Sequence, residues 1–216
     1  MTLPNAYKGV KKLFIAEILQ IAAIVLLLIG LVAYGVAAMD YEAFGKLTRG
    51  MTGVAIGSLI SICGALLLPF IAFILTLVGL NQASKDEHDY MRKAFLCTIW
   101  ALILAVIASC LQGLQVLVGL AGFLRIVCRI LEICMIVFSI MGVSEVTQNI
   151  SRQDVADMGP KIITIAVIAI VAATIASLLG SVVGGIAATI AYILMLVAYI
   201  TYFVFLARAT SALAKG

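Results

Sequence analysis

Hydrophobic residues fall into six long runs, and short charged or glycine-rich breaks separate them. Each run has about 20 residues or more, the length that an α-helix needs to cross the hydrocarbon core of a bilayer. The pattern therefore predicts an all-α membrane protein, a bundle of six transmembrane helices that forms a single integral membrane domain over residues 1–216. The predicted helices cover residues 13–38, 53–80, 94–113, 122–142, 162–182 and 187–207. The second is longer than the others, and Pro69 in its middle should kink it.

Two of the breaks are short enough to make their flanking helices antiparallel neighbours. Related blocks also end the second, fourth and sixth helices, starting at Gly79, Gly142 and Phe205, a spacing of 63 residues both times. We therefore predict three hairpins in tandem, an internal repeat about an axis along the membrane normal. The alternative is that any row of short hairpins gives similar spacings.

Composition agrees with the membrane prediction and limits what else the chain can contain. Hydrophobic residues make up 65% and charged residues 11% of the chain, and the mean hydropathy is +1.26. Soluble domains carry about 25% charged residues, so almost no chain remains for a soluble catalytic domain. The net charge of +4 comes from basic residues in short loops, which predicts no nucleic-acid partner.

Motifs for catalysis and for metal binding are missing from the sequence. It contains no nucleophile elbow, phosphate loop or zinc motif, and its one histidine, His88, lacks metal-ligand spacing. We therefore expect no enzymatic activity, no cofactor and no metal, and a membrane-embedded enzyme is the minor alternative. The five cysteines are interpreted as packing residues, although Cys110 and Cys128 flank one turn and a disulfide between them is the minor alternative.

Lysine and arginine are distributed unequally between the two sides that the predicted helices define. With the N-terminus inside, the outer side holds Lys46 and Arg49, with Arg125 inside the membrane edge. The positive-inside rule then predicts a multi-pass protein of the cell membrane with both termini cytoplasmic. The predicted inner side holds Lys8, Lys11, Lys12, Lys85, Arg92, Lys93, Arg152, Lys161, Arg208 and Lys215.

The predicted fourth helix carries the strongest chemical feature of the sequence. Arg125, Arg129 and Glu132 stand at i, i+4 and i+7, so on a helix they share one face. A helix that ends near Gly142 places Glu132 about 15 Å from the inner edge, close to the middle of the membrane. Charges at that depth are expensive and must face protein or water instead of lipid.

Two interpretations of this face remain open. Arg129 can pair with Glu132, and the remaining positive charge can anchor a carboxylate or phosphate, with Gln112 and Gln115 adding polar contacts across the turn. This predicts an outward-facing pocket for a small polar or anionic solute. Alternatively, the pair fixes helix packing while Arg125 extends its side chain to the interface.

A second polar group lies at the predicted cytoplasmic end of the first helix. Glu17 and Gln20 share one face there, and Lys12 and Lys93 are the candidate partners of the carboxylate. A structural ion pair is one interpretation of this group. A carboxylate that couples transport to protons is the other.

Small residues recur every four positions in two of the helices. Gly53, Gly57 and Ser61 do so in the second helix, and Ala172, Ala176 and Gly180 in the fifth. Such stripes let helix backbones approach closely. They predict close packing within the bundle or, alternatively, contact with a membrane protein partner.

These features favour a solute transporter, or the substrate-binding membrane subunit of one, embedded in the lipid bilayer. The alternative is a non-catalytic membrane scaffold or accessory subunit of a larger complex. Six helices in about 200 residues with both termini inside is a layout similar to that of the substrate-binding membrane subunits of energy-coupling-factor vitamin transporters. That resemblance is one of size and topology and assigns no residue.

Overall fold

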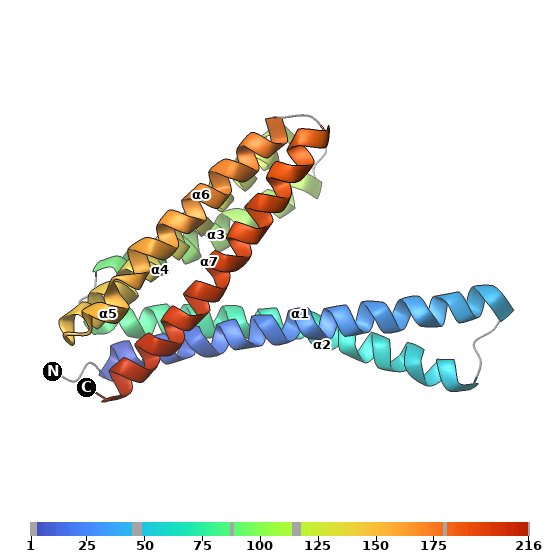
Figure 1. Ribbon diagram of the computed structural model, residues 1–216, viewed down its shortest axis with the longest axis horizontal. Helices are drawn as coiled ribbons and strands as arrows, with labels where there is room; N and C mark the ends of the chain where they lie inside the picture. Colours follow the sequence, from blue (N-terminus) through green and yellow to red (C-terminus); the bar gives the residue numbers. More distant parts are fainter. Residues whose placement is uncertain (1–3, 45–48, 87–88, 114–117, 179–180, 216) are drawn as a thin grey trace. The chain divides into compact units, whose positions relative to one another are not determined.

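The computed structural model describes residues 4–44, 49–86, 89–113, 118–178 and 181–215, and all regular structure within these ranges is helical (Figure 1). Short connections join successive helices. The elements are α1 (Pro4–Phe44), α2 (Arg49–Ala83), η1 (Ser84–Asp86), α3 (Asp89–Gly113), α4 (Val118–Asn149), α5 (Gln153–Ala156), α6 (Met158–Leu178) and α7 (Ser181–Lys215).

Six of the described helices are long and apolar enough to cross a membrane, which confirms the six predicted segments and is consistent with a multi-pass membrane protein. The helices extend beyond the apolar runs, because polar flanks continue the helical hydrogen bonding. The last connection falls between Leu178 and Ser181 instead of at 183–186. The spans are Pro4–Tyr41, Gly50–Asp86, Asp89–Leu111, Gly119–Asn149, Gln153–Ala172 and Ala188–Ala214.

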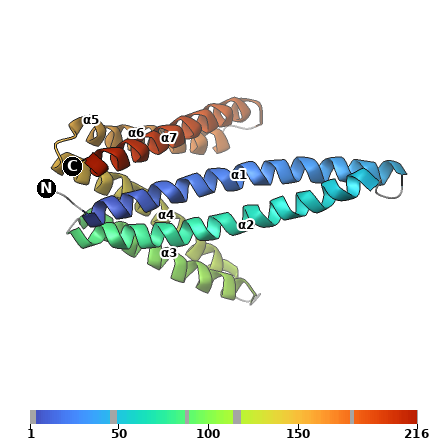
Figure 2. The same ribbon diagram turned by 90° about the horizontal axis from the view of Figure 1, so that it is seen from below.

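The chain divides into two compact units, residues 1–11 with 77–216 and residues 12–76. In the first unit α3 packs along α4, and α6 packs along α7. Helix α4 also contacts α5, α6 and α7. The α6 and α7 helices lie side by side in both ribbon views (Figures 1 and 2).

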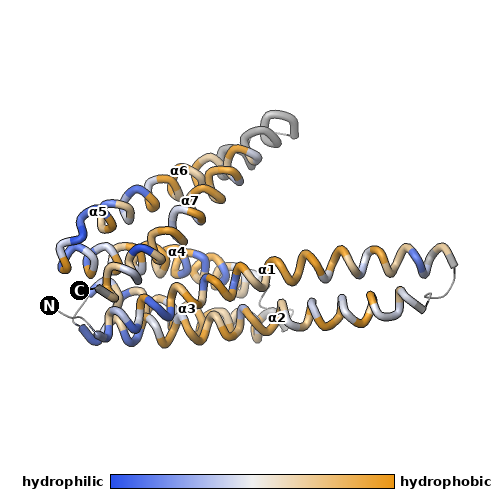
Figure 3. The backbone as a smooth tube through the Cα atoms, turned by 60° about the horizontal axis from the view of Figure 1, so that its bottom comes forward, coloured by the Kyte–Doolittle hydropathy of each residue, from blue (hydrophilic) through white to orange (hydrophobic). Residues whose placement is uncertain are grey.

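The most deeply buried side chains of the first unit lie at the end of its helices where both termini and α5 are found (Figure 1). Hydrophilic residues gather at the same end, while the helices leading away from it are mainly hydrophobic (Figure 3). A buried apolar core next to a polar end is expected where several helices enter the membrane from the same water phase. The fully buried side chains include Val10, Leu80, Met91, Val143, Val146, Val155, Phe205 and Leu206.

Within that core, the start of α1 approaches the end of α2 closely enough to require glycine. A Cβ atom placed on Gly9 would lie 2.6 Å from the carbonyl oxygen of Gly79 and 2.7 Å and 2.8 Å from the Cβ and N atoms of Ala83. Cα–H to carbonyl contacts and dispersion stabilise such close helix pairs. The contact joins residues about 70 positions apart in the first unit.

The N-terminus of α1 is capped by a residue from another part of the chain. The Oδ2 atom of Asp86 accepts a 2.7 Å hydrogen bond from the backbone N–H of Ala6, and its Oδ1 atom accepts a 2.8 Å bond from Nδ2 of Asn5. The first N–H groups of a helix lack partners within the helix, and an acidic group there also favours the helix dipole. The cap therefore fixes η1 against the start of α1.

The end of α4 is closed by a Schellman motif. The N–H of Arg152 donates to the carbonyl of Thr147, and the N–H of Ser151 donates to that of Gln148. Ser151 has a positive φ of 61°, in the region that glycine usually occupies at this position. The motif turns the chain from α4 into α5.

The second unit is the hairpin formed by most of α1 and the first part of α2. A Cβ on Gly30 would lie 2.8 Å from Cγ1 of Ile62 and 3.2 Å from the carbonyl oxygen of Ser58, so the two helices approach closely there. Gly53 and Gly57 are exposed, and a Cβ on either would meet no atom within 4 Å among the described residues. The close contact of this hairpin thus uses Gly30 together with Ser61 of the predicted stripe, whose Cβ would lie 3.2 Å from a Cβ on Gly30, and does not use Gly53 or Gly57.

Candidate charged site in the fourth helix

The ion pair predicted in the fourth membrane segment is present in α4. The Nη1 atom of Arg129 donates a 2.8 Å hydrogen bond to Oε2 of Glu132. The two residues are three positions apart, so one turn of helix brings their side chains together. The Arg129 side chain is nevertheless 80% exposed and that of Glu132 46% exposed. Arg125, one turn earlier, is also exposed.

The charged residues border the side of α4 that packs against α3. Ala121, Cys128 and Ser139 are buried, and the Cys128 thiol lies 3.6 Å from the carbonyl oxygen of Ala101 in α3. Small residues on this side let α4 pack against α3. Arg125 stands four residues after Ala121 and Glu132 four residues after Cys128, so the charged residues lie beside the buried stripe, at the edge of the contact with α3.

The pair lies at a position in the membrane span where charged side chains are costly. Arg129 and Glu132 lie near the middle of the span Gly119–Asn149, flanked by the exposed side chains of Ile126, Ile130 and Ile133. An arginine at the centre of a bilayer costs roughly 2.5–3.5 kcal/mol on insertion scales, so charged residues there normally face protein or water. The arrangement can hold an anion, because guanidinium binds carboxylates and phosphates through several N–H groups.

The remaining predicted site residues lie on other helices or outside the described residues. Gln115 and the side chain of Gln112 lie outside the described residues. Glu17 is half-buried on α1 in the second unit, which also contains Lys12. Lys93 lies at the start of α3 in the first unit, with its Nζ atom 5.4 Å from the ring centre of Tyr90. A contact between Glu17 and Lys93 stays a prediction.

The other sequence-based candidates form no metal site and no disulfide in the part of the chain that the structure describes. No group of three His, Cys, Asp or Glu side chains there is placed to hold a metal ion. All five cysteines are free, so Cys110 and Cys128 form no disulfide. In the second small-residue stripe Ala172 is half-buried. The side chain of Ala176 and the whole of Gly180 lie outside the described residues.

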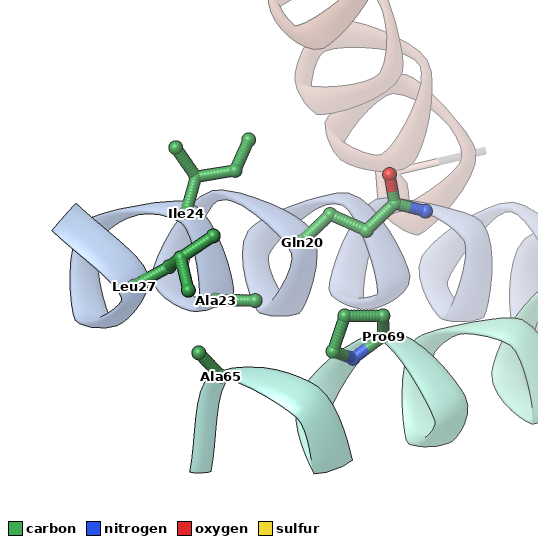
Figure 4. Close-up of a pocket in the computed structure, with 6 residues that line it drawn as sticks. All are labelled: Gln20, Ala23, Ile24, Leu27, Ala65 and Pro69. Carbon is green, nitrogen blue, oxygen red and sulfur yellow. The ribbon is translucent and has the colours of Figure 1, made fainter. Parts of the chain in front are cut away.

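The structure also contains a hollow, of which the sequence shows only the separate lining residues. A hollow of about 210 Å³ lies between α1 and α2 in the second unit (Figure 4). In the sequence, Gln20 is a polar residue of the first apolar run and Pro69 a helix breaker in the second. Only the fold brings them to the same hollow, whose lining residues are Gln20, Ala23, Ile24, Leu27, Ala65 and Pro69.

Comparison of the chain with protein-family models, with curated protein sequences and with solved structures gave no match.

Proposed function

We propose that the protein is a transport protein for a small polar or anionic solute, or the substrate-binding membrane subunit of one. The observation that carries the proposal is the position of Arg129, which pairs with Glu132 at 2.8 Å and still exposes 80% of its side chain near the middle of a membrane span. On this proposal the protein is not an enzyme.

The chemistry of the α4 face supports an anionic group as the ligand. Guanidinium has five N–H donors, and one of those on Arg129 binds Glu132. The others are available to a carboxylate or phosphate, and Arg125 adds a second positive charge one turn away. Gln112 and Gln115 would add neutral donors at the outer end of this site.

The bilayer supplies the second part of the argument. Charged side chains within membrane spans face the interior of a bundle or a water-filled cavity. An exposed ion pair at mid-span is therefore expected on a path that water and solute can reach, which opens outward in the proposed orientation.

Ligand-induced stabilisation tests this proposal. The purified protein in detergent is heated with and without acetate, succinate or phosphate, with chloride as the reference anion. We expect at least one of the three anions to raise the unfolding temperature by about 2–4 °C or more, because 1 kcal/mol of binding free energy corresponds to such a shift in a chain of this size. The double variant Arg129→Met/Glu132→Leu should lose the shift, and Arg125→Ala should reduce it.

The matched control is Arg152→Met/Asp154→Leu. It removes another exposed arginine–acid pair, with a distance of 3.0 Å, and also leaves the net charge unchanged. This control should keep the full stabilisation. If Arg129→Met/Glu132→Leu keeps it as well, the solute site does not lie on this face of α4.

A second candidate function is a non-catalytic scaffold or accessory subunit of a larger membrane complex. The observation that favours it is the exposure of Gly53 and Gly57 on α2, where a Cβ would meet nothing within 4 Å in the described residues. Small residues at this spacing are common where membrane helices meet closely. A scaffold would give no anion-dependent stabilisation when the protein is heated with the three anions.

We also propose three tandem hairpins in the cell membrane with both termini cytoplasmic. The bias of lysine and arginine toward one side supports this orientation. A reporter enzyme that is active only in the cytoplasm should be active when fused after Asp89 and inactive when fused after Gly45. Activity at Gly45 would contradict the orientation.

A further inference from the structure

Two cysteines of the first unit, Cys97 in α3 and Cys134 in α4, lie where these helices pack along each other. Both side chains are half-buried. The two thiols are close enough to interact electrostatically. Contacts on either side of the pair show how the two helices align at this level.

The first of these contacts joins two aromatic rings. The ring centres of Tyr90 in α3 and Phe138 in α4 are 6.3 Å apart. Cys97 stands seven residues after Tyr90, two turns along the same face of α3. Cys134 stands four residues before Phe138, one turn along the same face of α4. The two thiols therefore lie on the side of the helix pair where the rings meet.

A second contact brackets the pair from the other end. The Cys128 thiol lies 3.6 Å from the carbonyl oxygen of Ala101, which follows Cys97 by four residues, while Cys128 precedes Cys134 by six. The order of the contacts is thus reversed between α3 and α4, as in antiparallel helices. Ala94, fully buried one turn before Cys97, adds a small side chain to α3. Small residues let helix backbones approach closely, and a disulfide needs Cα atoms about 4.4–6.8 Å apart.

The surroundings of the two thiols favour a reaction that leaves no charge behind. Each lies at least eight residues from either end of its membrane span, or roughly 12 Å along a helix. A thiolate would place a charge in hydrocarbon there, which is costly. Among the described residues no third His, Cys, Asp or Glu joins the pair to complete a metal site. A disulfide, like two thiols, is uncharged.

We propose that Cys97 and Cys134 form a redox-active pair that a lipid-soluble quinone oxidises to a disulfide, which links α3 to α4. Two S–H bonds break and one S–S bond forms, while two electrons and two protons pass to the quinone, which leaves as the quinol. A quinone reaches this depth because it dissolves in hydrocarbon. Cys134 stands two residues after Glu132, and residues two apart do not share a helix face, so the pair is independent of the charged face of α4.

Thiol counting in lipid nanodiscs tests this proposal. Discs that hold one chain each keep exposed cysteines of different copies apart. Duroquinone is the probe, because its four methyl groups prevent thiols from adding to its ring. After oxidation and denaturation, maleimide labelling should count three thiols instead of five, and peptide mapping should find Cys97 linked to Cys134. Reduction should restore all five. Five thiols after duroquinone treatment, or a link between any other two cysteines, would overturn the proposal.

Cys128→Ala is the matched control, because it removes the buried cysteine of the same interface. Oxidation of this variant should still remove two thiols, from four to two. Cys97→Ala should keep all four of its thiols. A loss of two thiols in Cys97→Ala would mean that Cys134 reacts with a different cysteine, and the pair would then be wrongly assigned.

Discussion

Replacing Gly9 with alanine will strongly destabilise the first unit, although the substitution adds only one methyl group. The added Cβ would lie within 2.8 Å of three atoms of α2, two of them in its backbone. Backbone atoms cannot rotate away as a side chain can, so α1 and α2 must separate. Overpacking of this kind typically costs about 1–3 kcal/mol, or roughly 2–12 °C in unfolding temperature.

Gly35→Ala is the control for this prediction. A Cβ on Gly35, in the same helix, would meet nothing within 4 Å among the described residues. Alanine is the better helix former by about 0.5–1 kcal/mol, so this variant should be unchanged or slightly more stable. Thermal unfolding in detergent, followed by circular dichroism, measures both variants. Equal unfolding temperatures would mean that α1 and α2 do not approach each other at Gly9.

Glu132→Gln will produce the second large loss of stability. The substitution removes the carboxylate that Arg129 contacts at 2.8 Å and leaves a guanidinium without its acid near the middle of the span. The cost is at most that of an arginine at the bilayer centre, about 3 kcal/mol, and it is smaller where water of the proposed solute path reaches the guanidinium. We expect the unfolding temperature in lipid nanodiscs to fall, by at most about 6–12 °C.

The double variant Arg129→Met/Glu132→Leu should recover much of this loss. Replacing both members of the pair removes both charges from the middle of the span, whereas removing only the acid leaves the arginine alone there. Asp154→Asn is the control, because the Arg152–Asp154 pair lies at the end of a span instead of near its middle, and ion pairs in contact with water contribute little. If Glu132→Gln is as stable as the parent, the Arg129 guanidinium is hydrated or paired with another acidic group.

The sequence alone was sufficient for properties that depend on neighbouring residues. Six apolar runs predicted six helices able to span a membrane, because length and hydropathy decide whether a segment can cross. The Arg129–Glu132 pair also followed from sequence, since residues three apart meet on any helix whatever surrounds it. Boundaries were less accurate. Polar residues continue α1 and α2 beyond their apolar runs, and Gly184 and Gly185 lie within α7 instead of in a turn.

Tertiary structure decided which residues meet between helices. The spacing of Gly53, Gly57 and Ser61 predicted close packing, but only Ser61 lies at the close contact, opposite Gly30, and the two glycines are exposed. The cap of Asp86 on α1 and the hollow shared by Gln20 and Pro69 join residues about 80 and 50 positions apart. Such contacts depend on the rotation of each helix about its axis and on the register of each hairpin. A nearly uniform apolar sequence leaves both undetermined, because a helix that is hydrophobic on all sides has no preferred face.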